Sequence, residues 1–292
     1  LTPVEWEADP ELEWCPPGHG DIYTALLASG LLDALLDKGY RYAMTANSDN
    51  LGAVPSARIA GWFAASGAPY APEMCRRTPA DVKGGHLAVR KSDGRIILRD
   101  TAQTPEDQMH YFTDQFRHPF FHTNNLWFDL KVLRDTLAER GGILGLPLIK
   151  NSKTVDPADS SSVPVIQLET AMGAAVEAFE GATAIEVPRS RFLPVKTTND
   201  LLLVRSDVYE VDDDGLLQMV PERACTVKLD PRFYKKIQDF EARFPDGVPS
   251  IKGAQSLTVE GDWTFGSGVV ATGEALVSQE GSPGRIADGA RI

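Results

Sequence analysis

The chain has 292 residues, of which 42% are hydrophobic and 24% charged, as in soluble globular proteins with one large domain or a domain plus a smaller module. Its 41 acidic and 29 basic side chains give a net charge of −12, which repels nucleic acids and anionic membranes. The first residues are acidic and polar, which argues against a signal peptide. No apolar run is long enough for a membrane span. Three widely spaced cysteines fit no zinc site or disulfide framework, so we expect reduced thiols and a cytoplasmic location.

The first informative stretch is WCPPGHGDIYTALLASGLLDALLDKGY, residues 14–40. Leucines at helical spacing predict one helix, with Asp21 as its N-cap and Gly39 at its end. The Gly-Pro loop before it leads into a helix N-terminus, where backbone N–H groups attract anions. His19 in this loop either bonds a backbone carbonyl or donates to an anionic ligand.

Residues 40–46 predict a short buried strand, the NSDN sequence a turn, and residues 55–66 a helix. Ligands of open α/β sheets bind beyond the carboxyl ends of the strands. Asp49 in this turn is therefore either an Asx-turn residue or a Mg²⁺ ligand, since Mg²⁺ takes one or two carboxylates and fills its other positions with water and phosphate oxygens.

The remaining elements alternate in type along the chain. They are a strand over 69–77, a hairpin over 86–100, a helix starting near 104, a strand end, polar loop and helix over 120–142, a helix over 166–181, a constrained loop over 187–197 with a helix near 198, and short β runs after about residue 216. The DLLLV sequence near residue 198 could equally be a strand when taken alone. The paired amides Asn124 and Asn125 either cap the helix or bind sugar hydroxyls.

Basic side chains gather in VPRSRFLPVKTT, where two prolines restrain Arg189, Arg191 and Lys196. This is either a solvated basic loop or, in a chain of such negative charge, a phosphate site. Together with the anion-attracting loop, the aspartate and the amides, it indicates a sugar phosphate or a nucleotide as substrate.

Six motifs carry a family resemblance: PPGHGDIY, NSDNLGA, ADVKGG, HTNNLW, LETAMGAA and VPRSRFLPVKTTNDLLLV. In this order and at similar spacing they resemble the eukaryotic-type UTP–glucose-1-phosphate uridylyltransferases, also called UDP-glucose pyrophosphorylases. The resemblance covers nearly the whole chain and is weakest after about Leu216. The related UDP-N-acetylhexosamine pyrophosphorylases share the fold, but have a GNG-type loop where this chain has GHG.

The resemblance implies an α/β fold. Residues 1–216 would form a Rossmann-like (GT-A-like) nucleotidyltransferase domain with a mixed sheet, and residues 217–292 a left-handed β-helix module through which copies associate. The family opens with a Gly-rich LGGG-GT-type loop that is not found in this sequence, and the last β-helix turns look shortened. We therefore expect either a fragment of a larger protein or a misassigned start, and an inactive isolated chain is one expected outcome.

The resemblance also implies a reaction: Mg²⁺-dependent transfer of UMP from UTP to glucose 1-phosphate, giving UDP-glucose and pyrophosphate. The implied roles are the uridine nucleotide contact for Gly18, the sugar phosphate for His19, the sugar nucleotide for Asn47 and Ser48, Mg²⁺ for Asp49, glucose for Asn124, a sugar contact for Glu169, and phosphate for Lys196 as the main catalytic cation. Two alternatives stay open: a non-catalytic sugar-phosphate-binding or assembly protein of the same fold, and a pyrophosphorylase for another hexose 1-phosphate.

Overall fold

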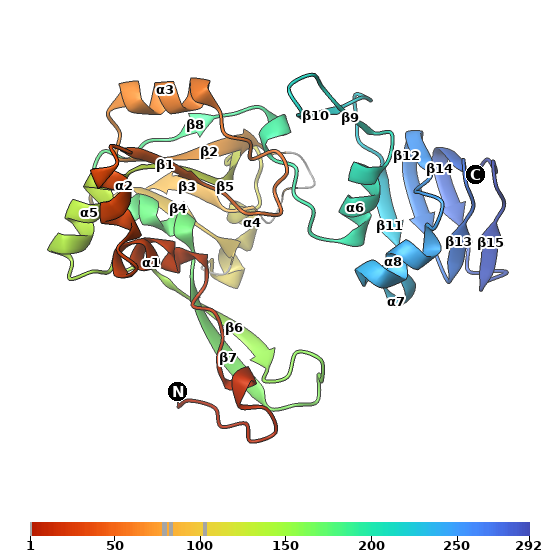
Figure 1. Cartoon of the computed structure of the whole chain (residues 1–292), viewed down its shortest axis with the longest axis horizontal. Helices are drawn as coiled ribbons and strands as arrows, with labels where there is room; N and C mark the ends of the chain where they lie inside the picture. Colours follow the sequence, from red (N-terminus) through yellow and green to blue (C-terminus); the bar gives the residue numbers. More distant parts are fainter. Residues whose placement is uncertain (1, 78–80, 82–83, 102–103) are drawn as a thin grey trace. The chain divides into compact units, whose positions relative to one another are not determined.

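The computed structural model describes residues 2–77, 81, 84–101 and 104–292, and the chain divides into two compact units (Figure 1). Unit 1 comprises Leu1–Asn47 and Pro55–Pro188, and unit 2 comprises Ser48–Val54 and Arg189–Ile292. This division reflects packing alone, so the functional boundary expected after residue 216 stays a prediction. None of the helices in the described ranges is long and apolar enough to cross a membrane.

Unit 1 is built on a four-stranded sheet, and this sheet is mixed, as the family resemblance implied. Its order is β1-β5-β2-β8, with β1 (Tyr42–Thr45) and β2 (Tyr70–Arg76) antiparallel to β5 (Phe120–Asp129), and β8 (Ile185–Glu186) parallel to β2. All but the last residue of β2 is buried, because strands pair with it on both sides.

The strand predicted over residues 40–46 is present as β1, but the expectation that it is buried is wrong. Tyr42 is exposed and the other three residues are half-buried. The reason is position, because β1 pairs with β5 alone in the described structure and so forms an edge of the sheet.

The single helix predicted after the Gly-Pro loop is two helices, α1 (Ile22–Ala28) and α2 (Leu31–Asp37). Gly30 lies between them with φ +74, a left-handed conformation that a continuous helix does not allow. Asp21 does occupy the predicted N-cap position of α1, but its side chain makes no capping hydrogen bond in the described structure. Gly39 does follow the last turn, with φ +86.

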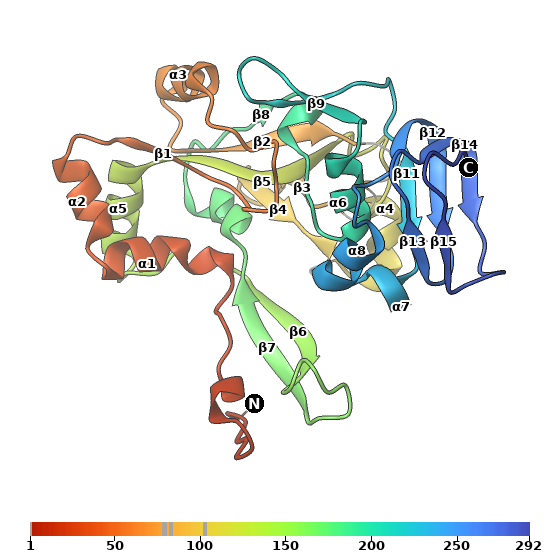
Figure 2. The same ribbon diagram turned by 45° about the vertical axis from the view of Figure 1, so that its right-hand side comes forward.

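Two further helices begin at side-chain caps. Ser56 accepts from the Ile59 N–H at the start of α3 (Ala57–Ser66), and Asp129 accepts from two N–H groups at the start of α5 (Leu130–Glu139). Figure 2 shows α1, α2 and α5 grouped beside β1, and hydrophobic side chains of these helices join the unit's core. That core is centred on Tyr23, Leu32, Tyr70, Leu126, Phe128, Leu133 and Val176.

Two segments adopt strands where the sequence predicted other structure. The polar HTNN stretch lies inside β5 rather than in a loop. Residues 164–170 form β7, followed by a 3₁₀ helix at Met172–Ala178, instead of one helix over 166–181. Pairing with distant strands decides both cases, since β5 lies between β1 and β2, and β7 pairs along its whole length with β6 (Leu148–Thr154).

The other elements of unit 1 are short. They are the 3₁₀ turns Pro10–Glu13, His19–Asp21 and Glu106–Gln108, helix α4 (Met109–Phe112), and the hairpin of β3 (His86–Val89) and β4 (Ile96–Arg99). This hairpin confirms the one predicted over residues 86–100.

Unit 2 begins, after the segment 48–54, with the 3₁₀ turn Arg189–Arg191, helix α6 (Thr198–Arg205) and the pair β9 (Tyr209–Val211) and β10 (Leu217–Met219). Parallel strands follow. They are β11 (Thr226–Leu229), β12 (Ser250–Val259) and β14 (Val270–Val277) in one sheet, and β13 (Trp263–Phe265) and β15 (Gly284–Ile286) in another, with helices α7 (Pro231–Tyr234) and α8 (Ile237–Arg243) between β11 and β12.

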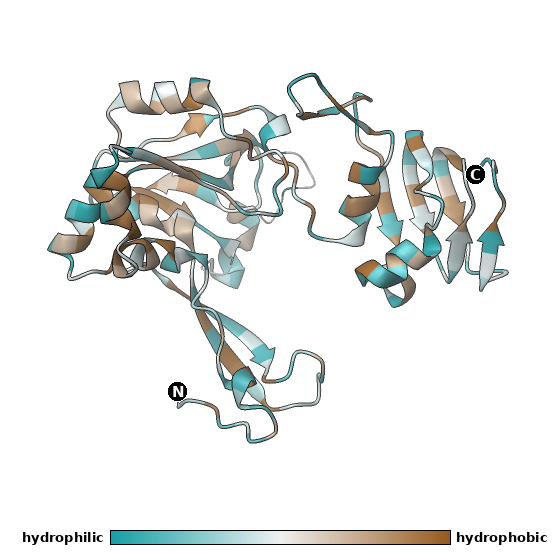
Figure 3. Ribbon diagram, viewed as in Figure 1, coloured by the Kyte–Doolittle hydropathy of each residue, from teal (hydrophilic) through white to brown (hydrophobic). Residues whose placement is uncertain are grey.

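These parallel strands enclose the core of unit 2. Buried and exposed residues intermingle along β12 and β14, and Figure 3 shows hydrophobic and hydrophilic residues next to one another on them. The buried side chains include Leu202, Tyr234, Phe240, Ile251, Leu257 and Phe265. The short β runs predicted after about residue 216 are therefore present, and from β11 onward they pair in parallel. That they form a separate module stays a prediction.

Candidate functional site

The Gly-Pro loop of unit 1 packs directly against the end of β7. Gly18 has φ +85, and a Cβ added there would lie 2.6 Å from the Thr170 oxygen and 2.9 Å from Glu169 Cβ. The Thr170 N–H donates to the Pro17 oxygen at 3.0 Å. Only glycine combines this conformation with so close an approach. The structure thus brings together two predicted site residues that are 151 positions apart in the sequence, Gly18 and Glu169.

His19 is oriented by the main chain that follows β7. The Met172 N–H donates to its Nδ1 at 2.9 Å, so the neutral ring carries its proton on Nε2. Desolvation lowers the pKa of His19, an effect that the nearby Glu169 and Asp100 carboxylates oppose. The His19 ring is therefore neutral near pH 7 and offers one N–H donor.

Two buried tyrosine side chains of the core fix the main chain at Met172. Its carbonyl oxygen accepts from the hydroxyls of Tyr23, at 2.9 Å, and Tyr70, at 3.1 Å. Both phenols are buried, which raises their pKa values and keeps them protonated as donors. Sequence analysis missed these residues as supports of His19, although Tyr23 and Met172 belong to the quoted motifs.

Asn124 is the only non-glycine residue with positive φ in the described ranges, at φ +62. Its N–H donates to Nδ1 of the buried His122 at 3.0 Å. Burial lowers the pKa of His122 to about 4, so this ring too is neutral and accepts through Nδ1. Backbone strain of this kind is often concentrated at functional sites.

Asn47 lies near the same point of the sheet. Thr45 and Leu126 are register partners in β1 and β5. Asn47 follows Thr45 by two residues and Asn124 precedes Leu126 by two, so the antiparallel register takes both asparagines past the same end of the pairing. Gly173 directly follows Met172, the residue that bonds His19. A Cβ added to Gly173 would lie 2.8 Å from His122 Cε1, so the chain after His19's partner lies close to the Asn124 region.

Ser48 and Asp49 belong to unit 2, where the segment 48–54 pairs with the basic loop. The Val195 N–H donates to the Asp49 oxygen at 2.8 Å, and the Leu51 N–H to the Leu193 oxygen at 3.0 Å. The buried Asn50 reinforces this pairing, because its Nδ2 donates to the Arg191 oxygen at 3.1 Å and its Oδ1 accepts from the Leu193 N–H at 2.7 Å. The NSDN turn was a local sequence signal near this pairing, although sequence analysis did not single out Asn50.

Lys196 directly follows Val195, so the pairing places its backbone beside that of Asp49. Its own N–H donates to Asp200 Oδ2 at 3.0 Å, next to the capping box of Thr197 and Asp200 that starts α6. The Lys196 residue is exposed, and its ammonium has no ion-pair partner within the described ranges. The backbone of Lys196 is thus fixed, while its ammonium group is unpaired in the described structure.

The Asp49 carboxylate meets one requirement of a metal ligand. Its Oδ1 is buried and has no hydrogen-bond partner in the described structure, although buried polar atoms are nearly always paired. Among the described residues no group of three or more His, Cys, Asp or Glu side chains is placed to hold a metal. Mg²⁺ takes one or two protein carboxylates and completes its shell with phosphate oxygens and water, so a lone carboxylate such as that of Asp49 is chemically compatible with the expected metal. Lys83 of the ADVKGG motif lies outside the described residues.

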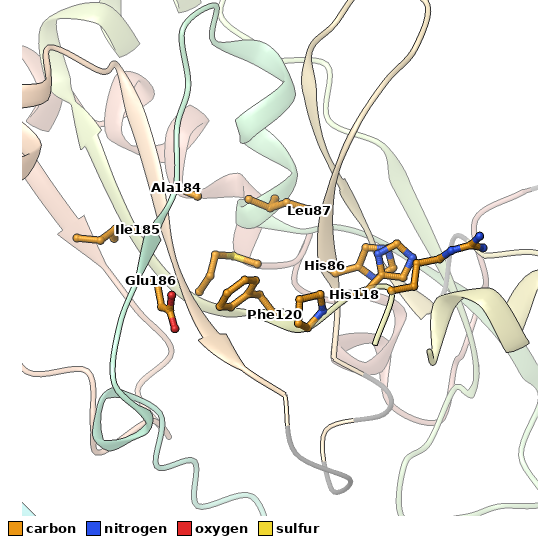
Figure 4. A pocket seen from close by; sticks show the side chains of 10 residues that line it. His86, Leu87, His118, Phe120, Ala184, Ile185 and Glu186 are labelled. Atoms are coloured by element: carbon orange, nitrogen blue, oxygen red, sulfur yellow. The ribbon is translucent and has the colours of Figure 1, made fainter. Parts of the chain in front are cut away.

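A pocket of about 370 Å³ lies elsewhere in unit 1, and no predicted site residue lines it (Figure 4). Met74, Phe120 and Ile185 form its apolar side, and Glu186 and the stacked rings of His86 and His118, 3.8 Å apart, add polar groups. Sequence analysis did not expect this pocket.

Comparison with known proteins agrees with the motifs. The sequence model of the UTP–glucose-1-phosphate uridylyltransferase family matches residues 1–271. The chain is 42% identical over 284 residues to the UTP–glucose-1-phosphate uridylyltransferase of Solanum tuberosum, a match that spans 96% of this chain and 57% of the relative. It is 40% identical over 281 residues to that of Saccharomyces cerevisiae, spanning 95% of this chain and 55% of the relative.

Solved structures give the same result. A UDP-glucose phosphorylase from Trypanosoma brucei is 44% identical with a TM-score of 0.88, over 99% of this chain and 63% of that one. A variant UDP-glucose pyrophosphorylase from Leishmania major in complex with UDP-glucose is 45% identical with a TM-score of 0.88, over 100% and 64%. The chain therefore spans a little over half the length of its curated relatives. It belongs to the UTP–glucose-1-phosphate uridylyltransferase family.

Proposed function

We propose that the protein transfers UMP from UTP to glucose 1-phosphate in a Mg²⁺-dependent reaction, giving UDP-glucose and pyrophosphate. The observation that carries this proposal is the hydrogen bond between the Val195 N–H and the Asp49 oxygen. It holds Asp49, whose Oδ1 has no partner among the described residues, beside the backbone of Lys196, whose ammonium has no ion-pair partner among them. Family membership supplies the substrates, since the relatives are named for this reaction.

The chemistry needs positive charge more than it needs a base. An anionic phosphate oxygen of glucose 1-phosphate attacks the α-phosphorus of UTP in line and pyrophosphate leaves, so no proton has to be removed from the nucleophile. Bound Mg²⁺ would neutralise phosphate charge, with Asp49 as its protein ligand. Lys196 would bind phosphate oxygens and stabilise the charge that moves toward the leaving group.

The residues of unit 1 would bind and orient the sugar nucleotide. His19 would donate from Nε2 to the sugar phosphate, a role that its Met172 contact and lowered pKa support. Gly18 would allow the uridine nucleotide to approach the main chain. Asn124 and Glu169 would contact glucose hydroxyls. Asn47 and the adjacent Ser48 would contact the sugar nucleotide.

We also propose that residues 1–216 act as the nucleotidyltransferase domain and that residues 217–292 form a left-handed β-helix through which copies associate. The parallel pairing of β11, β12 and β14, and of β13 and β15, supports a β-helix. The wide spacing of the three cysteines fits no disulfide framework, which supports a cytoplasmic location. Light scattering at several protein concentrations, with and without residues 217–292, tests the association.

Pyrophosphate release from UTP and glucose 1-phosphate with Mg²⁺ tests the function. It is measured on this 292-residue chain and on the natural protein that contains it, with galactose 1-phosphate as the competing sugar. We expect turnover by the natural protein that glucose 1-phosphate supports best. A folded natural protein that binds UDP-glucose but releases no pyrophosphate would overturn the proposal in favour of a non-catalytic binding protein.

A further inference from the structure

The left-handed Asn124 lies in an irregular part of the sheet. Pro72 pairs with Leu126 and Met74 with His122, so the single residue Glu73 of β2 faces three residues of β5. Asn124 is the middle one of the three. Bulges of this kind redirect side chains and are frequent beside functional sites.

Glu73 holds both ends of this bulge. Its Oε2 accepts from Asn125 Nδ2 at 3.0 Å and its Oε1 from Trp127 Nε1 at 2.8 Å. Its main-chain oxygen accepts from Thr123 Oγ1 at 2.8 Å, and that hydroxyl in turn accepts from the Asn125 N–H at 3.2 Å. The residues on either side of Asn124 are therefore both bonded to Glu73.

Burial makes this arrangement informative. Glu73 and Asn125 are fully inaccessible and Trp127 is 5% exposed. A carboxylate is costly to bury, and it is retained only where hydrogen bonds from its surroundings compensate the loss of water. An apolar residue would fill this position of a central strand at lower cost. The carboxylate is thus explained by what it holds, which is the backbone that presents Asn124.

We propose that Glu73 is a positioning residue for sugar recognition: its carboxylate fixes the bulge of β5 and so keeps Asn124 in the left-handed conformation that presents its amide to the hexose. This inference rests on the proposed function for the identity of the ligand. The hydrogen-bond geometry and the backbone of Asn124 stand without it.

The test compares three variants of the natural protein. In Glu73→Gln, the amide accepts one hydrogen bond but presents N–H groups to the second donor. The double variant Glu73→Gln with Asn125→Asp restores the match, because the new carboxylate accepts from the glutamine amide while the glutamine oxygen accepts from Trp127. Glu139→Gln makes the same chemical change at an exposed residue of α5 and serves as the control.

Calorimetry measures binding of UDP-glucose and of UMP, which lacks the hexose. We expect Glu73→Gln to weaken UDP-glucose binding about 10- to 100-fold, as misplacement of a binding group does, with UMP affinity unchanged. The apparent KM for glucose 1-phosphate should rise while that for UTP stays constant. The double variant should regain most of the loss, and Glu139→Gln should match the wild type.

Equal weakening of UDP-glucose and UMP, or no rescue by the double variant, would overturn the positioning role, since a general loss of structure predicts both. Crystal structures of the wild type and of Glu73→Gln decide the inference even if the wild type binds no UDP-glucose. In that case the proposed function fails, and the positioning role fails as well only if Asn124 keeps its positive φ in Glu73→Gln.

Discussion

The backbone oxygen of Asp49 and the N–H of Val195 are 2.8 Å apart, which places Asp49 next to Lys196. The buried Oδ1 of Asp49 has no hydrogen-bond partner among the described residues. The two residues come from segments more than 140 positions apart in the sequence. Their side chains take no part in the hydrogen bonds that join the segments, so each can be changed with little effect on the pairing.

Lys196→Ala is expected to lower the rate of pyrophosphate release about 10²–10³-fold, the usual cost of removing one electrostatic stabiliser. Its melting temperature should stay within a few degrees of the wild type, because the side chain is exposed and the pairing uses the main chain. Lys235→Ala, an exposed lysine of the same unit, is the control. A Lys196→Ala protein with wild-type turnover would remove the catalytic role.

Asp49→Asn is expected to raise the Mg²⁺ concentration needed for half-maximal turnover by at least tenfold, because the amide keeps the shape but loses the charge of the ligand. EDTA should stop turnover of the wild type, and added Mg²⁺ should restore it. Stability should not fall, since Asp49 Oδ1 has no hydrogen bond to lose in the described structure. Unchanged Mg²⁺ dependence in the variant would assign the metal to other groups.

Gly18→Ala tests the close approach between the Gly-Pro loop and β7. The added methyl group would overlap the Thr170 oxygen at 2.6 Å, so the loop must move and carry His19 with it. Gly30→Ala is the matched control, since Gly30 also has positive φ but no described atom within 4 Å of its added Cβ. Both should lose about 1 kcal/mol of unfolding free energy through backbone strain, and Gly18→Ala should lose more than Gly30→Ala because of the overlap with Thr170. Only Gly18→Ala should also lose UDP-glucose affinity, and equal affinity in both variants would contradict the assignment.

Local patterns were enough for much of the fold. The strand over residues 69–77, the hairpin at 86–100 and the helix after Pro55 were predicted from local residue patterns and turn residues, which act within a few residues. The failures involve contacts that a local pattern does not contain. The polar HTNN stretch has the local composition of a loop. It is part of a strand in the structure, where Glu73 of another strand accepts hydrogen bonds from its side chains.

The candidate site could likewise be predicted only in part from the sequence. Asp49 and Lys196 could be proposed from residue type and family motifs, and the structure then showed that their backbones are neighbours. The supports of the site could not be proposed, because Tyr23, Tyr70 and Glu73 read as ordinary core or strand residues in the sequence. Their role depends on partners between 47 and 149 positions away.

The contact between His122 and Asn124 predicts a pH dependence. Burial lowers the pKa of His122 from 6.5 to about 4, so between these values the unfolded chain binds a proton that the folded chain does not. The free energy of unfolding therefore falls as the pH falls through this window, by about 3 kcal/mol from this group. Protonation also removes the acceptor of the Asn124 N–H, because both ring nitrogens of an imidazolium are donors.

His122→Asn separates this contribution from that of other groups. The asparagine oxygen is able to accept from the Asn124 N–H but does not titrate, so the variant should lose less stability than the wild type between pH 7 and pH 4. The buried His86, whose pKa burial lowers to about 3, titrates in both proteins and cancels in the comparison. Urea denaturation at several pH values measures the difference, and parallel stability curves would show that His122 is not the group that couples acid to the backbone of Asn124.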